Sequence, residues 1–116
     1  MDFRKQKPIY LQIADHLSEQ VLQGSLTPDE RMPSVRDVAT SMGVNPNTVM
    51  RTFDYLQQEE IVYNRRGVGY FVAGDAKEKV LALQRREFLE EDLPLIKQKM
   101  KVLGIGIEEL TLDDVI

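Results

Sequence analysis

Two short helical patterns joined by a glycine turn, within residues 33–53, constrain the fold of this chain more than any other feature of its sequence. Ser34 is a favoured N-cap for the first helix, and Gly43 supplies the turn. Asn45 is a favoured N-cap for the second helix, and Pro46 occupies its first position, where the missing N–H costs nothing. The stretch therefore predicts a helix, a tight turn and a second helix.

The second predicted helix, residues 46–59, has an apolar side and a polar side. With about 100° of rotation per residue, three apolar side chains cluster and are expected to face the core: Val49, Phe53 and Leu56. The opposite side carries polar side chains, and Thr48 lies on its flank: Asn47, Arg51 and Asp54. The first turns of this helix can donate and accept hydrogen bonds, as a helix that reads base edges in the major groove must.

Two further helical patterns complete the predicted core. From Pro8 to Gly24 apolar side chains recur at helical spacing: Tyr10, Ile13, Ala14, Leu17 and Val21. Gly24 is predicted to end that helix as its C′ residue. The short helix after Ser34 is expected to bury four side chains: Val35, Val38, Ala39 and Met42.

Residues 61–72 predict a short hairpin with a basic, glycine-rich tip. Gly67 and Gly69 permit the tight reversal between its two strands. Arg65 and Arg66 precede the tip, where a guanidinium can pair with phosphate or enter a narrow minor groove. Added to the helix pair, the hairpin predicts an α+β fold, a winged helix-turn-helix.

The overall charge argues against simple electrostatic attraction to DNA. The net charge is −4, whereas a free-standing DNA-binding domain is often strongly basic. If this chain binds nucleic acid, the local placement of a few arginines must be responsible, because the overall field opposes it: Arg36, Arg51, Arg65 and Arg66.

The chain is predicted to divide near Gly74, into a DNA-binding domain of residues 1–73 and a helical region of residues 74–116. One helix is expected to run to about Glu91, and Pro94 is expected to break it and start another. The two helices carry apolar stripes: Val80, Leu81, Leu83 and Phe88, then Leu93, Ile96, Met100 and Leu103. These are too many for two short helices to bury alone, so we expect them to form a homodimer interface.

No enzymatic site is predicted. The chain has no cysteine and one histidine, and no serine or lysine has a plausible base partner in sequence. We therefore expect no catalytic residue, no metal and no cofactor. The longest apolar run has four residues, Val80 to Leu83, so no membrane association is expected. The lack of a signal peptide and of cysteine suits a cytoplasmic protein.

Residues 8–72 resemble the winged helix-turn-helix domain of the GntR family of bacterial transcription regulators. Four motifs carry the resemblance: Pro8-Ile9-Tyr10-Leu11-Gln12-Ile13, Met32-Pro33-Ser34-Val35-Arg36-Asp37-Val38-Ala39, Gly43-Val44-Asn45-Pro46-Asn47-Thr48-Val49, and Arg65-Arg66-Gly67-Val68-Gly69-Tyr70-Phe71-Val72. The remaining residues are too few for the large effector-binding domain of most members. The chain is thus similar to the short YtrA-like subfamily, whose members are dimers that repress operons, frequently those for ABC transporters.

The resemblance implies where this chain would touch double-stranded DNA. It assigns Arg36 to a phosphate or base contact, and the cap residue Ser34 is also expected to contact DNA. It places one group at the start of the recognition helix and another at the wing tip: Asn45, Asn47 and Thr48, then Arg66 and Gly67. Pro46 and Met50 stand where many members have arginine, and Arg51 is expected to replace those arginines in part. The implied function is a dimeric repressor of a transporter-type operon that binds an inverted-repeat operator.

Two other functions fit the same residues. A winged helix can serve protein contacts, and the acidic balance of the chain favours that use. A nucleoid-type protein that binds DNA without sequence preference is the other. Salt-dependent binding to operator DNA would separate the first from a regulator, and a comparison of specific with random DNA would separate the second. No residue specifies a small-molecule effector, which would fit between the C-terminal helices of two subunits.

Overall fold

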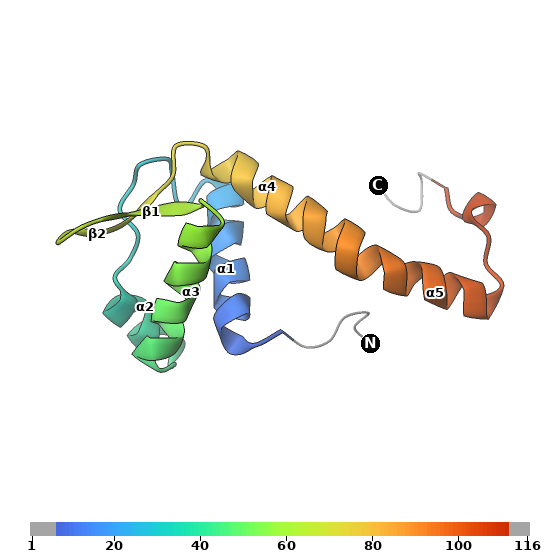
Figure 1. Cartoon of the computed structure of the whole chain (residues 1–116), viewed down its shortest axis with the longest axis horizontal. Coiled ribbons are helices and arrows are strands. Elements are labelled where there is room, and N and C mark those ends of the chain that lie inside the picture. The colour runs from blue at the N-terminus through green and yellow to red at the C-terminus, as the bar shows by residue number, and fades with distance from the viewer. Residues whose placement is uncertain (1–6, 112–116) are drawn as a thin grey trace. The chain divides into compact units, whose positions relative to one another are not determined.

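The computed structural model describes residues 7–111, which divide into two compact units, residues 7–84 and residues 85–111 (Figure 1). The first unit contains three helices, α1 (Ile9–Gln23), α2 (Val35–Met42) and α3 (Pro46–Gln58). A hairpin of β1 (Val62–Arg65) and β2 (Gly69–Val72) follows, and then α4 (Ala76–Glu87) begins. This is the winged helix-turn-helix, and the α+β fold class predicted from the sequence is confirmed.

The core of this unit lies where α1 and α3 pack side by side (Figure 1). Val49, Phe53 and Leu56 are fully buried, as the pattern of α3 predicts. On the predicted side of α1, Tyr10 is half-buried and the other four residues are buried, with Gly24 in the left-handed conformation at the helix end. The prediction that Met42 is buried is wrong, since 37% of its side chain is exposed. Met42 is the last residue of α2, where the chain turns away and leaves it uncovered.

The strand β2 is hydrogen-bonded along both edges. On one edge it pairs antiparallel with β1, with Val62 opposite Val72 and Arg65 opposite Gly69. On the other edge it binds the loop of residues 29–32, which the sequence did not mark as extended. The Met32 N–H donates to the Tyr70 carbonyl at 2.8 Å, and two further backbone bonds join Val72 to this loop. The wing is therefore held by the segment that leads into α2.

The first half of α4 belongs to the core of the first unit. Ala76, Val80 and Leu83 have 1%, 0% and 6% of their surfaces exposed and lie in one cluster with side chains of α1 and α3. The prediction that Val80 and Leu83 form a dimer interface is therefore wrong, because the chain itself covers them. The division between the units falls after Gln84, later than the predicted boundary near Gly74.

The second unit continues in helical conformation. A π-helical turn, η1 (Phe88–Asp92), leads into α5 (Leu93–Leu103), and a short 3-10 turn, η2 (Ile107–Glu109), follows. Pro94 was expected to break the helix, but the helix continues through it. The Leu93 N–H donates to the Phe88 carbonyl five residues earlier, and this wider turn gives the proline ring room that a regular α-turn lacks. As predicted, Gly104 ends α5.

Candidate nucleic-acid interface

The start of α2 presents Arg36 to solvent. The Ser34 Oγ accepts a hydrogen bond from the Asp37 N–H at 3.0 Å, so this hydroxyl caps the helix as predicted. Arg36 lies in the first turn and is exposed. No carboxylate among residues 7–111 forms an ion pair with it, which leaves its guanidinium available for a phosphate or a base.

The start of α3 is fixed in the same way. The Asn45 Oδ1 accepts from the Asn47 N–H at 2.8 Å, and Pro46 takes the first helical position. Thr48 is half-buried, whereas Asn47 is exposed. One turn further on, the buried Thr52 hydroxyl donates to the Tyr10 carbonyl of α1 at 2.7 Å. This bond and the buried apolar residues determine which side of α3 faces outward.

Arg51 is exposed but does not point straight out from α3. Its guanidinium carbon lies 4.1 Å from the centre of the Tyr10 ring, within the range of a cation–π contact. The side chain is thereby drawn toward α1. The outward side of α3 is left to residues without positive charge, chiefly Asn47, Met50 and Asp54.

The wing tip is a tight turn that carries Arg66. The Val68 N–H donates to the Arg65 carbonyl at 2.9 Å, and Gly67 has a φ of +78°, which glycine adopts at no steric cost. Arg65 lies over the ring of Phe71, with 4.9 Å between its guanidinium carbon and the ring centre. Arg66 stands at the turn itself and is exposed.

Arg31 positions this tip, a role that the sequence did not reveal. Its Nη2 donates to the Val68 carbonyl at 2.6 Å, across 37 residues of sequence. A Cβ added to Gly69 would lie 3.3 Å from the Arg31 Nε, and the Gly69 φ of +145° also disfavours any other residue. Because the contact joins the loop before α2 to the wing, no local pattern could have indicated it.

Two tyrosines join the wing to the rest of the unit. Tyr70 of β2 stacks on Phe53 of α3, with ring centres 4.7 Å apart, and burial, followed by the charge of Asp54, raises its pKa. Tyr63 of β1 donates to the Asp29 carboxylate at 3.0 Å. The pKa of Tyr63 is raised by desolvation first and by this hydrogen bond second. The hydroxyls therefore stay protonated at neutral pH.

Positive charge in this unit is distributed unequally between lysine and arginine. Five arginines are exposed, and none forms an ion pair with a carboxylate in the part of the chain that the structure describes: Arg31, Arg36, Arg51, Arg65 and Arg66. Of the lysines, Lys7 pairs with Asp15 at 2.9 Å and Lys79 with Glu60 at 3.1 Å, whereas Lys77 is exposed and forms no ion pair within the described residues. Unneutralised arginines are thus gathered on α2, α3 and the wing of a chain whose net charge is −4.

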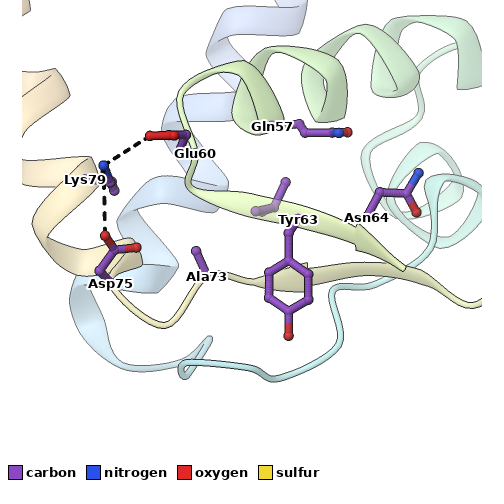
Figure 2. A pocket seen from close by; sticks show the side chains of 8 residues that line it. Gln57, Glu60, Tyr63, Asn64, Ala73, Asp75 and Lys79 are labelled. Atoms are coloured by element: carbon purple, nitrogen blue, oxygen red, sulfur yellow. Dashed lines mark hydrogen bonds and ion pairs between the residues drawn. The ribbon is translucent and has the colours of Figure 1, made fainter. Parts of the chain in front are cut away.

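An open polar pocket of about 460 Å³ lies between the end of α3, β1 and the start of α4. Figure 2 shows Lys79 between Glu60 and Asp75, which hold its ammonium from both sides. The hydrogen bond to Glu60 is the main cause of the raised pKa of Lys79. Its charge is therefore compensated, and the pocket offers no anion site. The ion pair between Lys79 and Glu60 links α4 to the end of α3.

Neither a metal site nor a membrane span is found in the described residues. No group of three histidine, cysteine, aspartate or glutamate side chains within residues 7–111 could hold a metal ion. None of the helices in that range is both long enough and apolar enough to cross a bilayer.

The comparisons with known proteins point to bacterial regulators. Residues 9–72 match the family model described as bacterial regulatory proteins, gntR family. The chain is 38% identical to the HTH-type transcriptional regulator YhcF of Bacillus subtilis, over 93% of this chain and 88% of YhcF. It is 32% identical to the HTH-type transcriptional repressor YtrA of the same organism, over 95% of this chain and 84% of YtrA.

Solved structures agree with this likeness. A putative GntR-family regulator from Bacteroides thetaiotaomicron superposes with a TM-score of 0.76 at 43% identity, covering 88% of each chain. The DNA-binding domain of AraR, solved in complex with operator ORX1, superposes with a TM-score of 0.57 at 28% identity. That match covers 59% of this chain and 82% of the AraR chain.

Proposed function

We propose that this chain, which belongs to the GntR family of bacterial regulatory proteins, is a dimeric repressor that binds an inverted-repeat operator. The chain is a DNA-binding transcriptional regulator, as its relatives YhcF and YtrA are regulators. One observation carries the proposal further: the capped start of α2 and the wing tip present arginines that no described carboxylate neutralises, and the capped start of α3 presents the exposed Asn47. Repression is supported by the similarity to YtrA, which is a transcriptional repressor.

Phosphate and base contacts are divided between these elements in the proposed complex. Arg36 and Arg66 bind phosphate, since both are exposed, Arg36 in the first turn of α2 and Arg66 in the turn of the wing. Asn47 reads a base edge from the first turn of α3. Arg51, drawn over Tyr10, reaches phosphate beside α1 and not a base.

The remaining predicted residues support this interface. The side-chain oxygens of Ser34 and Asn45 serve as helix caps, and their free donors add contacts to the backbone of the DNA. Thr48 packs at the flank of α3 and completes its first turn. Arg65 and Gly67 set the shape of the wing tip that places Arg66.

Dimer formation is proposed through the exposed apolar side chains at the end of α4 and beyond. Leu81, Phe88 and Leu103 are 50%, 45% and 60% exposed, and Leu93, Ile96 and Met100 are half-buried. Other large apolar side chains of this region are equally uncovered, among them Leu89 and Val102. Burying such surface against a second copy is favourable by about 25 cal/mol per Å². A two-fold dimer would present two copies of α3 to two half-sites.

The subfamily resemblance adds two further proposals. The regulated operon is of the transporter type, and the protein acts in the cytoplasm, where its DNA is. Residues 74–116 act as the dimerisation region, although α4 begins inside the core of the DNA-binding unit. No cofactor or catalytic residue takes part.

The proposal is tested with the full chain and DNA selected from a random pool. We expect an enriched inverted repeat whose binding weakens with salt, with a slope of about −0.9 per neutralised phosphate in a plot of log affinity against log salt. Selection without any enriched sequence would favour a nonspecific DNA-binding protein. Binding that does not change with salt, together with a monomer in light scattering, would favour a protein-contact module.

A further inference from the structure

One large apolar side chain stands on the outward side of α3. Met50 is 50% exposed, although the residues beside it in the helix, such as Val49 and Phe53, are completely buried. Met50 is not among the partly buried apolar side chains that pack against the core. Its thioether side chain therefore adds little to the stability of the core and remains available for contact with a partner.

The neighbours of Met50 define what it can meet. Asn47 lies three residues earlier, one helical turn away on the same side, and its side chain is exposed. Arg51 is drawn over the Tyr10 ring, so its charge does not cover Met50. The outward side of α3 thus presents an amide followed by an apolar side chain.

We propose that Met50 determines sequence specificity by contacting the 5-methyl group of a thymine in the major groove, next to a base pair read by Asn47. The inference rests on the proposed DNA binding through α3. The T methyl is the only apolar group on a base edge in that groove, and an asparagine amide pairs with adenine N6 and N7. Residues three apart on a helix are separated by about 4.5 Å along its axis, close to the roughly 3.4 Å between base pairs.

The same geometry disfavours a G·C pair at this position. A methionine has no donor for guanine O6 and N7 and no strong acceptor for the cytosine amino group. Pressing it against such an edge would remove water from those polar groups without replacing its hydrogen bonds. The half-site is therefore expected to contain A·T pairs opposite the first two turns of α3.

The test removes only the methyl group. A half-site selected from random DNA by the full chain is prepared with each thymine replaced in turn by deoxyuridine. We expect one replacement to weaken wild-type binding about fourfold, the factor that corresponds to about 0.8 kcal/mol for one buried methyl group. The Met50→Ala variant should bind the thymine and deoxyuridine sites equally. Met50→Gln, nearly the same in size, should also lose the difference.

Met42→Ala is the matched control, because Met42 is an exposed methionine at the end of α2. That variant should keep the wild-type preference for thymine. Wild-type protein that tolerates every deoxyuridine would overturn the inference while leaving the proposed function intact. Retained discrimination in both Met50 variants would do the same. If wild-type protein selects no sequence at all, the proposed function fails together with this inference.

Discussion

Phe53 and Phe88 are the same residue in two regions of this chain, and their surroundings differ. Phe53 of α3 is completely buried and stacks on Tyr70 of the wing. Phe88 is 45% exposed in the π-helical turn, and no side chain from Arg85 to Thr111 is buried. Isolated helices of this length are marginal in water, since most helix stability in proteins comes from packing. The first unit stabilises itself, whereas the second leaves its apolar side chains uncovered by the described chain.

The largest expected difference comes from truncating each phenylalanine. Phe53→Ala should lower the free energy of unfolding of the first unit by about 3–5 kcal/mol, because it leaves a cavity in the core and removes the Tyr70 stack. Phe88→Ala should change the same quantity by less than about 0.5 kcal/mol, as at other exposed sites. Urea unfolding at low protein concentration measures both. Equal losses of unfolding free energy would show that Phe88 is packed into a core as Phe53 is, and would contradict the comparison.

A charge in the second region should affect assembly and leave folding intact. Phe88→Asp is expected to raise the dimer dissociation constant at least about 100-fold, since an unpaired carboxylate would enter an apolar contact. Light scattering against concentration follows the dimer, and circular dichroism reports whether the first unit stays folded. Lys97→Asp, at an exposed polar position of α5, serves as the control. A monomeric wild-type protein at micromolar concentration would contradict the proposed dimer.

Two adjacent residues of α4 allow the buried and exposed sides to be compared within one helix. Val80 is completely buried and Leu81 is 50% exposed. We expect Val80→Ala to cost about 2 kcal/mol of unfolding free energy, from two lost carbon groups and the cavity they leave. Leu81→Ala, which removes more atoms, should have little effect on unfolding but should weaken dimer formation. If Leu81→Ala were the more destabilising to the monomer, the placement of α4 in the core would be wrong.

The smallest effect is expected in the wing, whose tip is exposed. Arg31→Ala removes the hydrogen bond to the Val68 carbonyl and should weaken operator binding about three- to tenfold through a less ordered tip. Its effect on unfolding should be about 1 kcal/mol or less. Fluorescence anisotropy with the selected operator measures the binding. Arg31→Lys should restore it only in part, while a loss of binding matched by a general loss of stability would indicate a structural role alone.

Local signals predicted the helix-turn-helix and the wing. Ser34 and Asn45 cap their helices as expected, because an N-cap depends only on residues within one turn. The hairpin turn with Gly67 is equally local. These features account for the fold of residues 33–72 and for the elements that carry the candidate interface.

Most of the errors and omissions share one physical cause, which is contact between distant segments. An apolar stripe shows which side of a helix avoids water, but not what covers it, and so Val80 and Leu83 were assigned to a partner. The contact between Arg31 and the wing joins residues far apart in sequence. The position of Arg51 over Tyr10 depends likewise on how α1 and α3 pack. The continuation of the helix through Pro94 required a turn of unusual width.

The gathering of unpaired arginines on α2, α3 and the wing has a kinetic consequence. Acidic residues outnumber basic ones in the chain, 19 to 15, so most encounters with random DNA meet repulsion and end quickly. Attraction arises only when the arginine-bearing elements face the duplex. We therefore expect this protein to spend little time sliding on unrelated sequence and to sample DNA through many brief collisions. Its occupancy of the operator is then set by how slowly it leaves the right site.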